Sequence, residues 1–262
     1  MIILLAGQKN VGKNSLADAL ELELEKRGTK TVQMAFSDPI KELVQMIFGW
    51  DAHYLWGASP MRSVFPIHWE RYPKVMWGNA FANCMDVDVC RFALNLGLTY
   101  QDLRSGVETL FNRCVKVREL PMPPYADYEW VEELSAREIL KCFGDLGRAI
   151  DPDMWVRELV KRTSKVQNAI IIVTDARYPN EISAIKALGG QAWLVVDNSP
   201  DRVLTTPDAH SSETSLPAVH SDESVYDLVV YNDRSKGLEY LNTQAEKLVD
   251  LLSFFTDLGR AI

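Results

Sequence analysis

A glycine-rich segment near the start of the chain, Gly7-Gln8-Lys9-Asn10-Val11-Gly12-Lys13-Asn14-Ser15, combines the residue types that hold phosphate. Glycines permit a tight bend and let backbone N–H groups approach an anion closely. Lys13 would bring positive charge to the outer phosphates of ATP, and a nearby hydroxyl can hold Mg²⁺. The strict pattern has Ser or Thr directly after the lysine, whereas here Asn14 intervenes before Ser15. The predicted ATP-binding residues of this loop are Gly7, Asn10, Val11, Gly12, Lys13, Asn14 and Ser15.

The residues on either side of this loop decide whether it is a chance glycine turn. The apolar run Ile2–Ala6 is typical of a central parallel strand covered on both faces. Leu16, Leu20 and Leu24 then recur every fourth residue, as on one face of a helix. A helix that begins at a phosphate directs its positive end toward the anion. This context favours a phosphate-binding loop over a chance turn.

Asp175 is the second residue that could do chemistry. It ends the apolar run 169–174, and Arg177 follows closely. A carboxylate there could organise Mg²⁺ through water or act as a general base. It could instead cap the next helix, which Pro179 begins. We favour a functional role, because ligands of parallel sheets bind at the carboxyl ends of the strands.

Several cations could grip a second phosphate. Arg137 and Arg148 lie on or near the helices that precede the strand of Asp175, and arginine binds phosphate bidentately. Lys41 lies in the first turn of a helix that Asp38 is expected to cap, where it could reach an acceptor. For each cation the alternative is a solvated surface charge. By spacing alone, Trp155 is more typical of a core residue than of a ligand contact.

These residues need a sheet to position them. Helical patterns alternate with strand patterns, which predicts an α/β fold of the P-loop NTPase type, with a parallel sheet of about five strands flanked by helices. We interpret residues 1–262 as a single P-loop kinase domain. Residues 50–134, rich in Trp, Tyr, Pro and Arg, are predicted to form a mostly helical insertion that binds the acceptor or acts as a lid. The predicted strands are 2–6, 31–36, 169–174, 192–196 and 227–231.

Composition limits the partners. The chain has 262 residues and a net charge of −8, which disfavours nucleic acid and anionic membranes. Its four cysteines contain no C-x-x-C pair, which indicates reduced thiols and a cytoplasmic location, the host cytoplasm if the protein is viral. The first apolar run is too short for a signal peptide, and no stretch has the length of a membrane span.

Seven segments in order resemble the deoxynucleoside monophosphate kinases of tailed bacteriophages. They cover nearly the whole chain except about residues 50–130. That family has Asp and then Thr after the loop lysine, and tends to have Gly-Thr at positions 144–145. The segments are the phosphate loop, Phe36-Ser37-Asp38-Pro39-Ile40-Lys41, Ser135-Ala136-Arg137 leading into Gly144-Asp145-Leu146-Gly147-Arg148, Asp153-Met154-Trp155-Val156, Thr174-Asp175-Ala176-Arg177-Tyr178-Pro179-Asn180-Glu181, Asp208-Ala209-His210-Ser211-Ser212-Glu213, and Tyr231-Asn232-Asp233-Arg234-Ser235.

The resemblance implies transfer of the γ-phosphate of ATP to a deoxynucleoside monophosphate. It implies that Asn232 lies near the adenine and that Ser15 and Asp175 serve Mg²⁺. Lys13, Asp175, Arg137 and Arg148 would be catalytic. The residues implied around the acceptor are Lys41, Arg62, Arg137, Gly144, Asp145, Arg148, Trp155, Asp175, Arg177 and Glu181.

The residues themselves leave alternatives open. A phosphate acceptor is already an oxyanion, so its kinase needs positive charge and alignment more than a base. A hydroxyl acceptor, such as a nucleoside or dephospho-coenzyme A, would need Asp175 as a base. A slowly hydrolysing nucleotide switch is a third interpretation, although the chain lacks an N-K-x-D guanine motif. The many cations favour a small nucleotide acceptor, and a homodimer is compatible with this interpretation.

Overall fold

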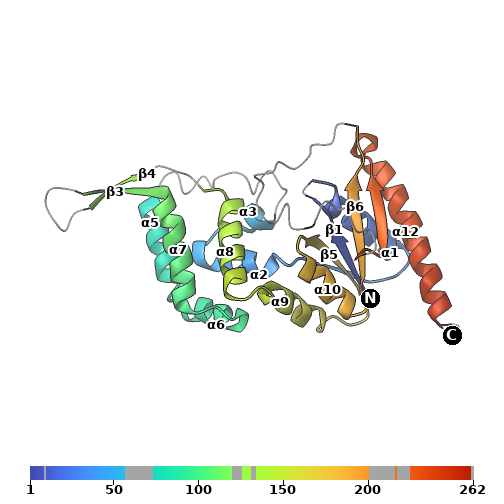
Figure 1. The fold of residues 1–262 in the computed structure, drawn as a ribbon, viewed down its shortest axis with the longest axis horizontal. Coiled ribbons are helices and arrows are strands. Elements are labelled where there is room, and N and C mark those ends of the chain that lie inside the picture. The colour runs from blue at the N-terminus through green and yellow to red at the C-terminus, as the bar shows by residue number, and fades with distance from the viewer. Residues whose placement is uncertain are drawn as a thin grey trace. The chain divides into compact units, whose positions relative to one another are not determined.

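The computed structural model describes residues 1–8, 10–56, 73–119, 126–130, 134–200, 216 and 225–260. The chain divides into two compact units, which we call the sheet unit (residues 1–36 and 159–262) and the helical unit (residues 37–158). Helix α9 (Met154–Thr163) contributes residues to both. Figure 1 shows the elements of each unit along the chain. The predicted insertion at 50–134 falls within the helical unit, and its role stays a prediction.

The sheet unit is built on five parallel strands, which confirms the predicted α/β class. The central strand is buried from its second residue onward, as its continuous apolar sequence requires. Two residues of the predicted second strand, Ala35 and Phe36, lie beyond its observed end. The spatial order is β2 (Thr31–Met34), β5 (Ile170–Ala176), β1 (Ile2–Ala6), β6 (Gln191–Asp197) and β7 (Leu228–Asn232).

This strand order creates a switch point between β1 and β5. From β1 the chain crosses to β2 on one side, whereas from β5 it crosses to β6 on the other. The two connections therefore leave neighbouring strands in opposite directions, and ligands of parallel sheets bind at the carboxyl ends of the strands at such a point. The phosphate loop follows β1 there, and Asp175 lies near the end of β5.

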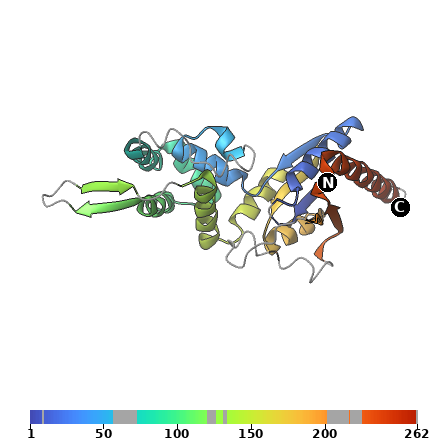
Figure 2. The same cartoon turned by 90° about the horizontal axis from the view of Figure 1, so that it is seen from above.

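Helices cover both faces of the sheet. Helices α1 (Lys13–Lys26) and α12 (Gly237–Arg260) pack together on one face, and α10 (Pro179–Ala187) lies on the other (Figure 2). Alternate residues of β1, Ile3 and Leu5, join the core under α1 and α12. This core fixes the direction in which α1 leaves the phosphate loop.

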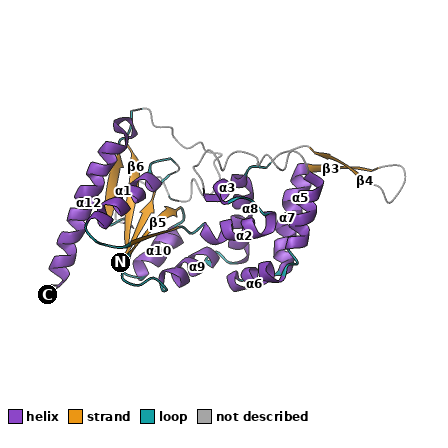
Figure 3. Ribbon diagram, turned by 180° about the vertical axis from the view of Figure 1, so that it is seen from behind, coloured by secondary structure: helices purple, strands orange, loops and turns teal. Residues whose placement is uncertain are grey.

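The helical unit consists mainly of helices (Figure 3), and it has its own aromatic core. Phe48 packs edge-on against Trp77 and Phe143, with ring centroids 5.9 and 6.3 Å away. Its helices are α2 (Asp38–Phe48), α3 (Ala52–Trp56), α5 (Pro73–Asn83), α6 (Val87–Leu96), α7 (Tyr100–Cys114) and α8 (Ala136–Ile150).

An antiparallel hairpin follows α7 directly. Its strands are β3 (Val115–Glu119) and β4 (Ala126–Trp130), with Val117 opposite Tyr128. The sequence interpretation predicted no strand in this region, because it took the aromatic and proline-rich stretch as mostly helical. The hairpin is therefore a feature that the structure adds.

Candidate functional site

The phosphate loop curls around the head of its own lysine. Lys13 Nζ donates to the carbonyl oxygens of Gly7 and Gln8, each at 2.7 Å, and the residue is only 7% exposed. Asn10 (φ 63°) and Gly12 (φ 95°) both adopt left-handed backbone conformations. Buried ammonium groups need such polar partners, and these two carbonyl oxygens help to fix the position of this one. The loop thus keeps a positioned cation at the carboxyl end of β1.

Two of the loop glycines are required by close neighbours. A Cβ on Gly7 would lie 2.5 Å from the carbonyl oxygen of Val195, on β6. A Cβ on Gly12 would overlap Nδ2 of Asn232, at the end of β7. Both glycines also have positive φ values, which side chains disfavour. The loop is therefore pressed against the ends of the strands beside it, and its shape depends on them.

Helix α1 begins at Lys13 with an end suited to an anion. Gly12 holds the N-cap position without a side-chain hydrogen bond, and no acidic residue lies in the first turn. Asn14 is exposed in that turn and Ser15 is half-buried. Because Asn14 is neutral, the positive end of the helix keeps its full effect on a bound phosphate.

Asp175 lies at a bulge in β5. Leu4 pairs with Val173 and Ala6 with Ala176, so β5 uses one more residue than β1 over this stretch. Bulges re-aim side chains. Here Oδ1 of Asp175 accepts a 2.7 Å hydrogen bond from the N–H of Phe36, just beyond β2. The carboxylate is thus fixed at the switch point.

The alternative role of Asp175 as a helix cap does not hold. Tyr178 occupies the N-cap position of α10. Buried Glu181 accepts from the N–H groups of Arg177 (2.6 Å) and Tyr178 (3.0 Å), and so stabilises the start of this helix. The structure therefore gives Glu181 a structural task, and its predicted contact with the acceptor stays a prediction.

Asn232 at the end of β7 and Asp197 at the end of β6 both form hydrogen bonds with neighbouring loops. Buried Asn232 donates from Nδ2 to the carbonyl of Val11 at 2.9 Å. Asp197 accepts from the N–H and hydroxyl of Ser199 and lies 3.4 Å from Nη1 of Arg234. Burial opposes ionisation of Asp197, but these hydrogen bonds and the Arg234 charge outweigh it and lower its pKa.

Sequence reasoning did not include Asp197 and Ser199 among the candidate site residues. The signal was present, because Asp197 ends an apolar strand just as Asp175 does. Neighbouring parallel strands bring their carboxyl ends to one edge of the sheet, so the same rule applies to both acids.

In the helical unit, two of the predicted cations, Lys41 and Arg148, form ion pairs with acidic side chains. Lys41, in the first turn of α2, is buried, and its Nζ lies 2.9 Å from Oδ1 of Asp38. Ser37 takes the N-cap position, so the predicted capping by Asp38 is wrong and its carboxylate pairs with Lys41 instead. On α8, Nη2 of Arg148 lies 2.6 Å from Oδ1 of Asp145. Each acid therefore fixes the direction of its cation.

Glycine residues shape the same face of α8. A Cβ on Gly144 would lie 3.1 Å from Nη2 of Arg148, so the guanidinium lies along the bare helix backbone. Arg137, in the first turn of α8, is half-buried. The capping box between Ser135 and Glu138 starts this helix, with the N–H of Ser135 2.9 Å from Oε2 of Glu138.

Trp155 lies in the core of the helical unit. It is 2% exposed, and its indole N–H donates to the carbonyl of Gly144 at 3.0 Å. The ring covers Gly147 so closely that a Cβ there would lie 2.6 Å from Cε2. This placement agrees with the helical spacing of Trp155, and contact with the acceptor stays a prediction.

The structure thus gathers the predicted residues into two groups. The phosphate loop, Asp175 and Asn232 belong to the sheet unit, and Lys41, Arg137, Gly144, Asp145, Arg148 and Trp155 to the helical unit. Arg177 is half-buried and lies two residues before α10. Arg62 and the segment Asp208–Glu213 lie outside the described residues.

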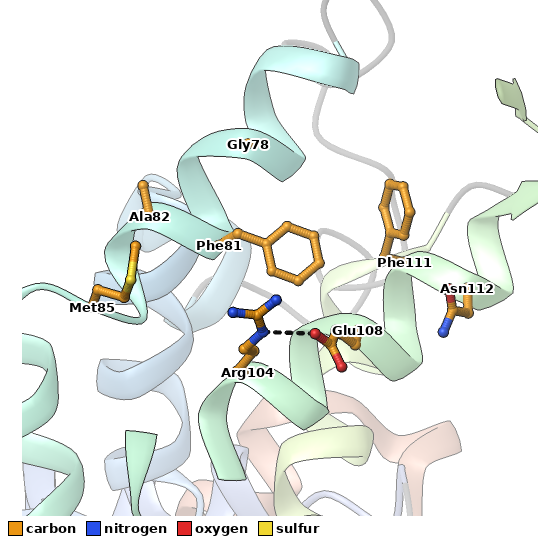
Figure 4. Close-up of a pocket in the computed structure, with 8 residues that line it drawn as sticks. All are labelled: Gly78, Phe81, Ala82, Met85, Arg104, Glu108, Phe111 and Asn112. Atoms are coloured by element: carbon orange, nitrogen blue, oxygen red, sulfur yellow. Dashed lines mark hydrogen bonds and ion pairs between the residues drawn. The ribbon is translucent and has the colours of Figure 1, made fainter. Parts of the chain in front are cut away.

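A separate hollow lies between α5 and α7 in the helical unit (Figure 4), with a volume of about 550 Å³. Among its lining residues, Nε of Arg104 lies 2.7 Å from Oε1 of Glu108, and the ring centroids of Phe81 and Phe111 are 5.7 Å apart. The eight lining residues all differ from those predicted for the site: Gly78, Phe81, Ala82, Met85, Arg104, Glu108, Phe111 and Asn112.

Two searches over the described residues gave negative findings. No helix among them has the length and apolarity to cross a membrane. Within the same residues, no group of three His, Cys, Asp or Glu side chains is placed to hold a metal ion.

Comparison with known proteins gives two viral relatives, and no family model matches the chain. The uncharacterized protein ORF77 of Ictalurid herpesvirus 1 (strain Auburn) is 33% identical over 91 residues, which are 33% of this chain and 39% of that protein. A protein of Acanthamoeba polyphaga mimivirus, 30% identical over 97 residues (37% of this chain, 44% of that protein), is named "putative deoxynucleotide monophosphate kinase". The matches thus span about two fifths of either relative. The chain is similar, over this part, to a viral protein with a nucleotide kinase name.

Proposed function

We propose that this chain is a kinase that transfers the γ-phosphate of ATP to a deoxynucleoside monophosphate, giving ADP and a deoxynucleoside diphosphate. The observation that carries the proposal is the phosphate loop, which holds a buried lysine at the switch point of a parallel sheet. The kinase name of the mimivirus relative supports the same reaction. The resemblance to the bacteriophage enzymes suggests the deoxynucleotide acceptor.

The donor would bind at the phosphate loop. Backbone N–H groups and the start of α1 would face the phosphates, and Lys13 would exchange a loop carbonyl for a phosphate oxygen. The hydroxyl of Ser15 and the carboxylate of Asp175 are hard oxygen donors, which suit Mg²⁺. When bound, Mg²⁺ would neutralise charge on the phosphates.

The acceptor phosphate would bind to cations of the helical unit. Lys41 and Arg148 are the best candidates, because their acid partners Asp38 and Asp145 orient them. An incoming phosphate carries more charge than a carboxylate and would compete for the same N–H groups. The phosphate of the proposed acceptor is already ionised and needs no base. A kinase for such an acceptor therefore needs alignment and positive charge.

A coupled assay of ADP formation with a panel of acceptors tests the proposal. ADP formation should depend on dTMP, dGMP or a modified dCMP, and nucleosides and dephospho-coenzyme A should give none. Lys13→Met should abolish turnover, because it removes the buried cation of the loop. Lys26→Met is a matched control on the same helix, since Lys26 is exposed and pairs only with a neighbouring surface acid in the described contacts.

The panel also separates the alternatives. Asp175 at its bulge could serve as a base for a hydroxyl acceptor, and turnover with a nucleoside or dephospho-coenzyme A alone would establish that reaction. ATP hydrolysis that no acceptor accelerates would favour a nucleotide switch. Full activity of Lys13→Met would overturn the phosphate-loop mechanism itself.

A further inference from the structure

We infer that Asn232 is a positioning residue that acts on the triphosphate through the phosphate loop and not through the base. Its side chain lies at the end of β7, is 4% exposed, and donates from Nδ2 to the carbonyl of Val11 at 2.9 Å. The two residues are 221 positions apart in the sequence. This inference rests on the donor half of the proposed function, the binding of a triphosphate at the loop.

The hydrogen bond fixes the orientation of one loop peptide. In a trans peptide the C=O and the following N–H point in opposite directions. Because Asn232 holds the carbonyl of Val11, the N–H of Gly12 must point away from β7. An orphan N–H at the start of a helix is the kind of donor that a phosphate loop presents to its ligand. Asn232 therefore sets the direction of a donor without being that donor.

Asn232 also packs closely against Gly12, which further restricts the orientation of this peptide. Nδ2 of Asn232 occupies the place that a Cβ on Gly12 would need. There is thus no room for a side chain at position 12 on that side of the loop. Since Gly12 also has a φ of 95°, its peptide could otherwise rotate easily, and the amide of Asn232 removes that freedom.

The backbone of Asn232 extends the same network to β6. Its carbonyl accepts from the N–H of Asn198 at 3.1 Å. Next to it, the N–H of Arg234 donates to the hydroxyl of Ser199 at 2.9 Å, and that hydroxyl donates to Asp197 at 2.5 Å. One buried residue therefore connects the loop after β1 with the ends of β6 and β7.

Asn232→Asp is the decisive variant. It keeps the size of the side chain but replaces the donor with an oxygen that faces the carbonyl of Val11. Asn83→Asp is the matched control, because Asn83 is a half-buried amide in the helical unit that donates to the carbonyl of Ile47 at the same 2.9 Å. Titration calorimetry would measure the Kd of each protein for MgATP and for inorganic tripolyphosphate, which has no base or ribose.

Asn232→Asp should raise the Kd for both ligands by a similar factor, about tenfold or more, because a buried acceptor loses its donor. Asn83→Asp should leave both Kd values within about twofold of the wild type. A loss for MgATP alone would overturn the inference and place Asn232 on the base. Unchanged Kd values for both ligands would also overturn it.

Two further measurements keep the test clear. Asn232→Leu keeps the branched shape of the side chain but has no polar atom and no charge, so it should reproduce the loss if Asn232→Asp folds poorly. Circular dichroism would confirm the fold of each variant. Wild-type protein that binds neither ligand would refute the donor half of the proposed function, whereas wild-type binding with normal Asn232 variants would refute only the role of Asn232.

Discussion

Replacing Gly147 with Ala should dislodge Trp155 from its place in the helical unit. Gly147 lies inside α8, and a Cβ there would overlap Cζ2 of Trp155 and lie 2.6 Å from Cε2. Real Cβ atoms do not approach carbon so closely, so the indole must tilt or the helix must shift. Tilting would also weaken the 3.0 Å hydrogen bond from the indole N–H to the carbonyl of Gly144.

The size of the effect follows from three contributions. Gly to Ala inside a helix stabilises by about 0.5–1 kcal/mol. Overpacking a core typically costs about 1–3 kcal/mol. Loss of the indole hydrogen bond costs about 1 kcal/mol. The free energy of unfolding of the variant should therefore be lower than that of the wild type by about 1–3 kcal/mol.

Gly78→Ala is the matched control. Gly78 is also inside a helix, α5, but a Cβ there would meet no atom within 4 Å. This variant should be more stable than the wild type by about 0.5–1 kcal/mol. Urea unfolding followed by tryptophan fluorescence would measure both, with equal m-values as the check on comparable transitions.

The outcome bears directly on the role of Trp155. If Gly147→Ala proves as stable as Gly78→Ala, the indole is not anchored on α8 and the packing argument is refuted. A free indole could then serve the acceptor, as the family resemblance implies. The expected destabilisation would instead support a structural role for Trp155.

Two further predictions concern acids of the sheet unit. Asp175→Asn should lower turnover about 100-fold or more, although the amide oxygen can still accept the hydrogen bond from the N–H of Phe36. Equal activity would make Asp175 a structural residue only. Asp197 has a lowered pKa, so its ionised form stabilises the fold above about pH 4 and this contribution is lost below. The stability gap between wild type and Asp197→Asn should therefore narrow from pH 6 to pH 3, and a constant gap would contradict this.

The loop after β1 and the helix after it were predictable because their shape depends on neighbouring residues. The apolar run of β1, the glycines and the repeat of leucines on α1 lie next to one another in the chain. Tight turns, helix starts and buried strands depend on neighbouring residues and on backbone φ, which sequence patterns report directly. The α/β class followed for the same reason, from the alternation of strands and helices.

The hairpin β3–β4 was not predictable in this way. Its strands are five residues each and stand beside a proline-rich stretch, so no helical or alternating period is long enough to identify them. Short strands gain their stability from pairing, which residue propensities do not encode.

By itself, the sequence determined that a glycine-rich loop follows a buried strand and opens a helix. Only the tertiary structure decided what holds that loop, because strand order brings distant residues together. Asn232 reaches Val11 across 221 positions, and Asp175 reaches Phe36 across 139. Similarly, the burial of Trp155 depends on Gly144 and Gly147 facing it across a helix contact. Such partners are set by packing in three dimensions, where buried polar groups must each find a hydrogen bond.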